Sequence, residues 1–206
     1  MKTKKTSVNQ ITEGVIWKQL LFFFFPIMLG TLFQQLYNTA DAVVVGRFVG
    51  TQALAAVGGS TGQMVNLIVG FFVGLSSGAT VIIARYYGAK NKKELNDTLH
   101  TAAALSIVGS IIITIAGIAL TPFMLKLMNT PKDVIQGSST YLRIYFAGII
   151  FVFIYNVGSA ILRAVGDSKR PLYFLIVCCF INIFLDVLLV VGFNMGVAGA
   201  ALATVI

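Results

Sequence analysis

The chain has 206 residues, of which 57% are hydrophobic and 11% charged, and its mean hydropathy is +0.89. About a quarter of the residues of a soluble domain are charged, so this composition excludes an ordinary soluble domain. The net charge of +8 is no argument for nucleic-acid binding, because cytoplasmic loops of membrane proteins collect Lys and Arg. The expected surroundings are therefore a lipid bilayer, and no nucleic-acid partner is expected.

Long stretches of the chain carry no charge at all. Residues 48–84, 98–125 and 144–162 contain no Asp, Glu, Lys or Arg. A spanning helix needs roughly 20 mostly apolar residues, and the apolar runs here are continuous rather than alternating, which disfavours a β-barrel. We predict an all-α polytopic membrane protein with a six-helix transmembrane bundle. The expected spans are 16–44, 53–86, 98–122, 139–163, 171–193 and 196–206.

The first segment contains a proline and a polar stripe. Pro26 lacks a backbone N–H and clashes with the preceding turn, so we predict a kink or hinge there. Gln34, Asn38 and Asp41 are spaced by four and three residues, which places them on one helical face, with Tyr37 beside them. A polar stripe within a span must face protein or water, so these side chains are predicted to line a cavity.

The second segment carries small and polar residues at helical spacing. Gly70, Gly74 and Gly78 predict a flat ridge against which a neighbouring helix packs closely. Gln63 and Asn66 share a face. They either continue the polar cavity lining or bond to a neighbouring helix, and the sequence favours neither interpretation.

The third segment has no internal polar landmarks and is interpreted as scaffold, whereas the fourth carries several. Tyr141 and Tyr145 near its outer start are typical of the aromatic belt at a membrane interface. Asn156 lies well inside the span and is a candidate for the cavity lining or for a local bond. Gly166 and Asp167 then predict a tight turn into the fifth segment.

The fifth segment holds Asn182 and Asp186 on one face, and the sixth holds Thr204. By depth, Asp41, Asp186 and Thr204 can share one cavity in the outer half of the membrane, with Asn182 one turn below Asp186. The sixth segment stops about ten residues in, at mid-membrane by depth, where its last carbonyls would be unsatisfied. We therefore expect a chain that is truncated or completed by a partner.

Basic residues alternate between the two sides of the membrane from loop to loop, which predicts a cytoplasmic N-terminus. Eleven are expected inside: Lys2, Lys4, Lys5, Lys18, Arg85, Lys90, Lys92, Lys93, Arg163, Lys169 and Arg170. Four are expected outside: Arg47, Lys126, Lys132 and Arg143.

Asp41 and Asp186 are the main candidates for function. A carboxylate within a span is costly unless it lines a cavity or is paired. Removal from water and a second nearby carboxylate both favour proton uptake, so the two acids predict a site that gains and loses a proton. The oxygens of Asp41, Asn182, Asp186 and Thr204 also suit a sodium ion. The alternative is that each polar residue bonds locally and only stabilises the bundle.

The sequence resembles the multidrug and toxic compound extrusion (MATE) transporters in five stretches that occur in the family's order. They are QQLYNTADAVVVGRFVG at 34–50, ALAAVGG at 53–59, ARYYGAKNKKE at 84–94, LRAVGDSKRPLYFLIV at 162–177 and GVAGAALAT at 196–204.

This resemblance implies that residues 1–206 form the N-terminal six-helix lobe of a twelve-helix exporter in a prokaryotic plasma membrane, with the second lobe absent. It implies export of cationic or amphipathic organic molecules in exchange for H⁺ or Na⁺, with no other cofactor. By resemblance, Pro26 matches the bend of the first helix. Asp41, Asn182 and Asp186 match the cation site, and Asn156 and Thr204 match its lining.

Two rival hypotheses remain beside the exporter. A flippase for lipid-linked oligosaccharides from the same superfamily would need cationic residues at mid-span, and the sequence shows none there. A membrane fragment or subunit without transport activity is the second rival. An enzyme is not expected, because the sequence has no nucleophile–base pair, metal cluster or phosphate loop.

Overall fold

The computed structural model describes residues 15–206, and all its regular elements in this range are helical. They are α1 Ile16–Phe48, α2 Thr51–Gly58, α3 Ser60–Gly88, α4 Lys92–Leu127, α5 Ile135–Ala164, α6 Lys169–Asp186, the π-helix η1 Val187–Gly192 and α7 Gly196–Val205. Five helical segments of the described part are long and apolar enough to cross a membrane. The predicted all-α, multi-span membrane fold is confirmed. Lys2, Lys4 and Lys5 lie outside the described residues.

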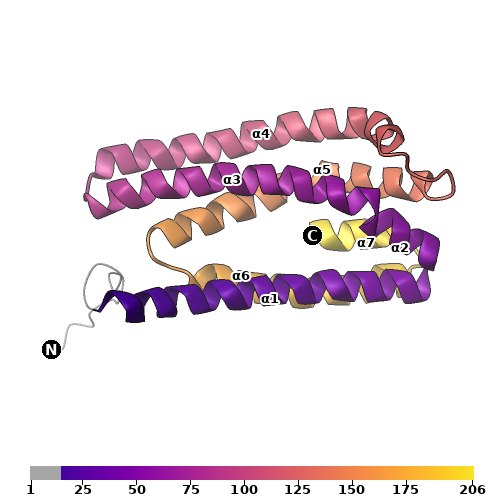
Figure 1. The fold of residues 1–206 in the computed structure, drawn as a ribbon, viewed down its shortest axis with the longest axis horizontal. Helices are drawn as coiled ribbons and strands as arrows, with labels where there is room; N and C mark the ends of the chain where they lie inside the picture. Colours follow the sequence, from indigo (N-terminus) through magenta and orange to yellow (C-terminus); the bar gives the residue numbers. More distant parts are fainter. Residues whose placement is uncertain (1–14) are drawn as a thin grey trace.

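The helices form two layers, which α2 and α7 join at one end of the molecule and the last part of α5 joins to α6 at the other (Figure 1). The first layer is the parallel pair α1 and α6, and the second contains α3, α4 and α5. The helices α2 and α7 join the layers at the end where α1 finishes. Within the described residues α1 packs on α6 but not on α3 or α5, so the layers are separated along much of their length.

The centre of the packing is α5. Its side chains Leu142, Phe146, Ile149 and Phe153 are almost fully buried, and the ring of Phe153 stacks on Phe72 of α3 at 3.8 Å between centroids. The outward faces of the long helices carry exposed Leu, Ile, Val and Phe side chains instead. Apolar residues on both faces are expected where a helix contacts protein on one side and lipid on the other.

Two helices depart from the predicted spans. The second span is broken between α2 and α3 at Gly59, where an added Cβ would lie 2.6 Å from the carbonyl oxygen of Ala55. Gly and Ser pairs are common causes of sharp helix bends, and the sequence here is Gly58-Gly59-Ser60. The fifth span changes from α-helix to π-helix directly after Asp186, a change that the sequence analysis did not predict.

The first helix runs through Pro26 without interruption, and Figure 1 shows α1 as one continuous helix. The proline therefore does not divide this segment into two helices. Pro26 is buried, and so is Gly30 one turn later, which packs against Leu172 and Leu175 of α6. A hinge role for Pro26 stays a prediction.

The predicted ridge on α3 has no packing partner in the described part of the chain. A Cβ added at Gly70, Gly74 or Gly78 would meet no heavy atom within 4 Å. The close approaches occur at Gly117 of α4, against the ring of Phe146, and at Gly148 of α5, against Val205. The glycines that permit tight helix packing are therefore not those that the spacing indicated.

A Gly117→Ala substitution should destabilise the bundle, because the new Cβ would lie 2.5–2.8 Å from ring atoms of the fully buried Phe146. Overpacking of this kind costs about 1–3 kcal/mol. Thermal unfolding in detergent, followed by circular dichroism, measures the effect. Gly74→Ala is the matched control, because nothing lies within 4 Å of its new methyl group. Equal melting temperatures for the two variants would contradict the assigned packing.

Candidate functional site

Two acidic side chains come together between α1 and α6. Asp41 belongs to the buried stripe of α1, and Asp186 is the last residue of α6. They are 7% and 0% exposed, and their carboxyl groups lie close enough to share a hydrogen bond when one of them holds a proton. The two acids meet because α1 and α6 are parallel neighbours that start at the same end of the bundle, and each acid lies near the far end of its helix.

Asn182 and Thr204 complete this cluster. Asn182 lies one turn before Asp186 on α6, is 7% exposed, and lies beside Asp41. The hydroxyl group of Thr204 on α7 lies 3.4 Å from Oδ2 of Asp41 and 2.8 Å from the carbonyl oxygen of Ala200. Its single proton is donated to one of these oxygens at a time, and the shorter distance favours Ala200.

When both carboxyl groups are ionised and can only accept, most of the polar atoms of the cluster have no hydrogen-bond partner. These atoms are Oδ1 of Asp41, both amide atoms of Asn182 and both carboxyl oxygens of Asp186. No Lys or Arg of the described residues forms an ion pair with either acid. Buried polar groups are normally bonded, and a buried pair of negative charges is very costly. The geometry therefore suits a bound proton, or a hard cation held by oxygen ligands.

A central cavity of about 530 Å³ borders this cluster. Of the residues predicted to form the site, it is lined by Gln34, Tyr37, Asn38, Asp41, Asn66, Asn156, Asn182 and Thr204. Asp186 does not line the cavity and lies fully buried behind Asp41. Gln63 is exposed and is not part of the lining, so the cavity interpretation fails for it although its neighbour Asn66 is placed as predicted.

Several residues of the lining were missed by the sequence analysis. Tyr141 and Tyr145 were assigned to the membrane interface, but they are 6% and 4% exposed and line the central cavity. The assignment was wrong because α7 folds back over α5 and covers this part of it. Tyr155 and Arg163 of α5 also line the cavity. The sequence analysis did not identify Arg163 as a cavity residue, because basic residues are common at the ends of spans.

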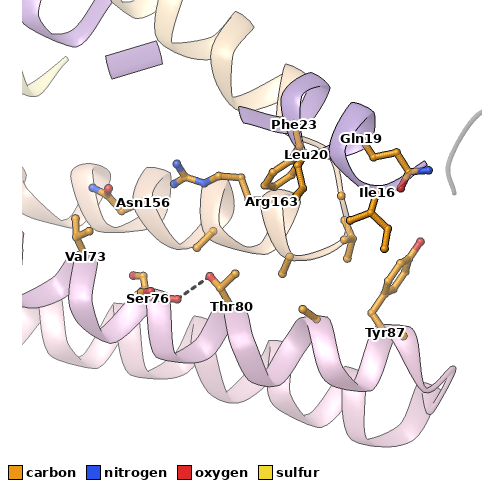
Figure 2. A pocket seen from close by; sticks show the side chains of 17 residues that line it. Ile16, Gln19, Leu20, Phe23, Val73, Ser76, Thr80, Tyr87, Asn156 and Arg163 are labelled. Atoms are coloured by element: carbon orange, nitrogen blue, oxygen red, sulfur yellow. Dashed lines mark hydrogen bonds between the residues drawn. The ribbon is translucent and has the colours of Figure 1, made fainter. Parts of the chain in front are cut away.

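A second cavity, the end cavity, lies between the layers where α1 begins and α3 and α5 finish, and has a volume of about 660 Å³ (Figure 2). Its walls include Leu20 and Phe23 of α1 and Ser76 and Thr80 of α3. The two cavities share Val73, Asn156 and Arg163 as lining residues. They are therefore adjacent parts of one hollow region that runs between the layers.

Comparison with known proteins places this fold and site in a family. A sequence model described as MatE matches residues 26–188, a range that contains Asp41, Asn182 and Asp186. The chain belongs to the MatE family. The probable multidrug resistance protein YoeA of Bacillus subtilis is 35% identical over 195 residues, and the match covers 93% of this chain and 42% of YoeA.

Crystal structures of a MATE protein in the straight and bent conformations match this chain with TM-scores of 0.89 and 0.88 at 30% identity. Both matches cover 98% of this chain, but only 44% and 45% of the solved ones. The chain thus spans less than half the length of these relatives. Across that length, its helices follow the arrangement of a MATE fold.

The two adjacent cysteines give a test of the central cavity. Cys178 is exposed and lines the cavity, whereas Cys179 is 3% exposed. A water-soluble maleimide should label Cys178 in a Cys179→Ala variant much faster than Cys179 in a Cys178→Ala variant. Intact-protein mass spectrometry measures both rates. Equal labelling, or labelling of Cys179 alone, would contradict a water-accessible cavity on this face of α6.

Proposed function

We propose that the chain is the N-terminal six-helix lobe of a multidrug exporter, driven by entry of H⁺ or Na⁺. The observation that carries this proposal is the buried acid pair, whose unpartnered oxygens lie beside a cavity of about 530 Å³. The name of YoeA as a probable multidrug resistance protein, and the share of its length that this chain spans, support it. The transported molecules are small cationic or amphipathic organic compounds.

The coupling step acts through the repulsion between Asp41 and Asp186. With both carboxylates charged, α1 and α6 are held together against electrostatic repulsion in a dry environment. A proton, or a Na⁺ ion held by oxygens of Asp41, Asn182, Asp186 and Thr204, removes that repulsion and strengthens the packing of the two helices. Binding of the cation therefore favours one conformation of the lobe over the other.

A conformational change in α1 needs a flexible point, and Pro26 supplies it. The missing N–H leaves the carbonyl group of Phe22 without its intrahelical donor. Because Pro26 and Gly30 both face α6, a bend there alters the packing that brings Asp41 to Asp186. Solved straight and bent conformations of a MATE protein that both resemble this chain support the proposal.

The membrane orientation is proposed from charge. In the described part, eight basic residues lie at the end of the bundle where α1 begins and four at the opposite end. The richer end is placed in the cytoplasm of a prokaryotic cell, with the N-terminus inside. In this orientation the acid pair belongs to the outer half of the cell membrane.

The flippase alternative is less well supported. Recognition of a lipid diphosphate calls for several positive charges within the cavity. Among the described residues that line the two cavities, Arg163 is the single Lys or Arg. A chain without transport activity is distinguished from the exporter by the efflux measurement that follows.

Asp41→Asn in the complete natural polypeptide should reduce efflux of a fluorescent organic cation from cells at least tenfold, because the amide cannot take up a proton or balance a cation. Asp133→Asn is the matched control, since Asp133 is an exposed acid in the turn before α5. Unchanged efflux in Asp41→Asn, with the same dependence on pH and sodium, would show that Asp41 has no role in coupling.

Sodium should raise the thermal stability of the purified protein if Na⁺ occupies the cluster. A ligand at 100 times its Kd stabilises the state that binds it by about 2.7 kcal/mol. Asp186→Asn should abolish the effect, and potassium serves as the salt control. A rise of equal size with potassium, or one that survives in Asp186→Asn, would be evidence against a sodium site here.

A further inference from the structure

The end cavity contains a cation that the proposed transport cycle does not use. Arg163 is half-buried at the end of α5, and Figure 2 shows its side chain extended along the helix toward Asn156. Its Nε donates to the carbonyl oxygen of Ser159 at 3.2 Å. Among the described residues no carboxylate lies within ion-pair distance of its guanidinium group.

A half-buried guanidinium without an acidic partner is unusual. Removal of its charge from water is costly unless an anion or several acceptors compensate. One of its five N–H donors is used on Ser159, and the planar fork formed by the others suits a carboxylate or a phosphate. The environment of Arg163 therefore calls for an anion.

The other lining residues of the end cavity indicate what kind of molecule carries the anionic group. No Asp or Glu lines it, so no side chain of the lining repels a negative group. Ser76 and Thr80 of α3 place hydroxyl groups on the wall that faces α5, while Leu20, Phe23 and Val73 provide apolar surface (Figure 2). A volume of about 660 Å³ lies within the usual range for small-molecule sites, 300–1,000 Å³.

The cavity is also open toward the surroundings of the bundle. Ile16 and Leu20 form part of its lining and are 75% and 61% exposed. Because α1 packs on α6 but not on α3 or α5, the wall between α1 and α3 is not closed by helix contacts in the described residues. Within the described residues, this opening leaves room for an apolar chain to enter between α1 and α3.

We propose that the end cavity is a binding site for an anionic amphiphile, whose carboxylate or phosphate head pairs with Arg163 and whose alkyl chain lies against Leu20, Phe23 and Val73. A phospholipid of the bilayer and a free fatty acid share this chemistry. The site is distinct from the acid pair, and it would exist whether or not the chain exports drugs.

Binding is measured on the complete natural polypeptide in a neutral detergent by isothermal titration with dodecyl phosphate. Arg163→Gln should weaken binding at least tenfold. Arg85→Gln, which removes an exposed basic residue at the same end of the bundle but outside the cavity, should leave it unchanged. Dodecyltrimethylammonium has the same tail with a positive head and should not bind.

A second variant tests the same binding site if Arg163→Gln does not fold. Ala84→Phe places a large ring in the lining and keeps the arginine at position 163, and it should also weaken binding of dodecyl phosphate at least tenfold. Inorganic phosphate should bind far more weakly than dodecyl phosphate, because it lacks the tail. Equal affinity for inorganic phosphate, equal loss in Arg85→Gln, or binding of the cationic amphiphile would overturn the proposal.

The two sources of the amphiphile are separated by mass spectrometry of the protein after purification from vesicles of phosphatidylglycerol and phosphatidylcholine. Selective retention of phosphatidylglycerol by the wild type but not by Arg163→Gln identifies a membrane lipid. Binding of added dodecanoate, without retention of lipid, identifies a soluble amphiphile. The proposal is wrong if folded wild-type protein binds none of these anions. That result is expected if another part of the polypeptide supplies a carboxylate that pairs with Arg163.

Discussion

The structure depends most on two carboxyl groups that meet without a basic partner. Asp41 and Asp186 are buried between α1 and α6, and most of their oxygens have no hydrogen-bond partner. Two fixed negative charges at this place would oppose the packing of the two helices. In the proposed function, a proton or a sodium ion removes this opposition, which would make the packing of α1 and α6 depend on the surroundings of the protein.

The course of the chain after Asp186 adds a further residue to the same cluster. The π-helix η1 starts directly after this residue, and π-helical turns are rare and frequent at functional sites. The chain then reverses into α7, which packs on α5 and brings Thr204 to within 3.4 Å of Asp41. Short and irregular segments thus complete a cluster that two straight helices alone would leave without the hydroxyl group of Thr204.

Sequence reasoning located the helices and the acid cluster, because long apolar runs and i, i+4 spacing depend on local geometry alone. It failed where the direction of a side chain depends on packing across the bundle. Tyr141 and Tyr145 lie near the end of a span, yet α7 covers them. The regularly spaced glycines of α3 have no helix packed against them in the described part of the chain. The break at Gly59 had a local signal, the adjacent Gly58 and Ser60, which was not used.

The position of Arg163 explains why the acid pair stays unneutralised. Arg163 lines the central cavity together with Asp41, yet its guanidinium group is not among the groups that act on either acid. A fixed arginine paired with Asp41 would stabilise the bundle permanently and leave no charge for a mobile cation to balance. Arg163 is the one Lys or Arg among the described residues that line the two cavities, and under the two proposals its separation from the acid pair leaves each charge for a ligand of opposite sign.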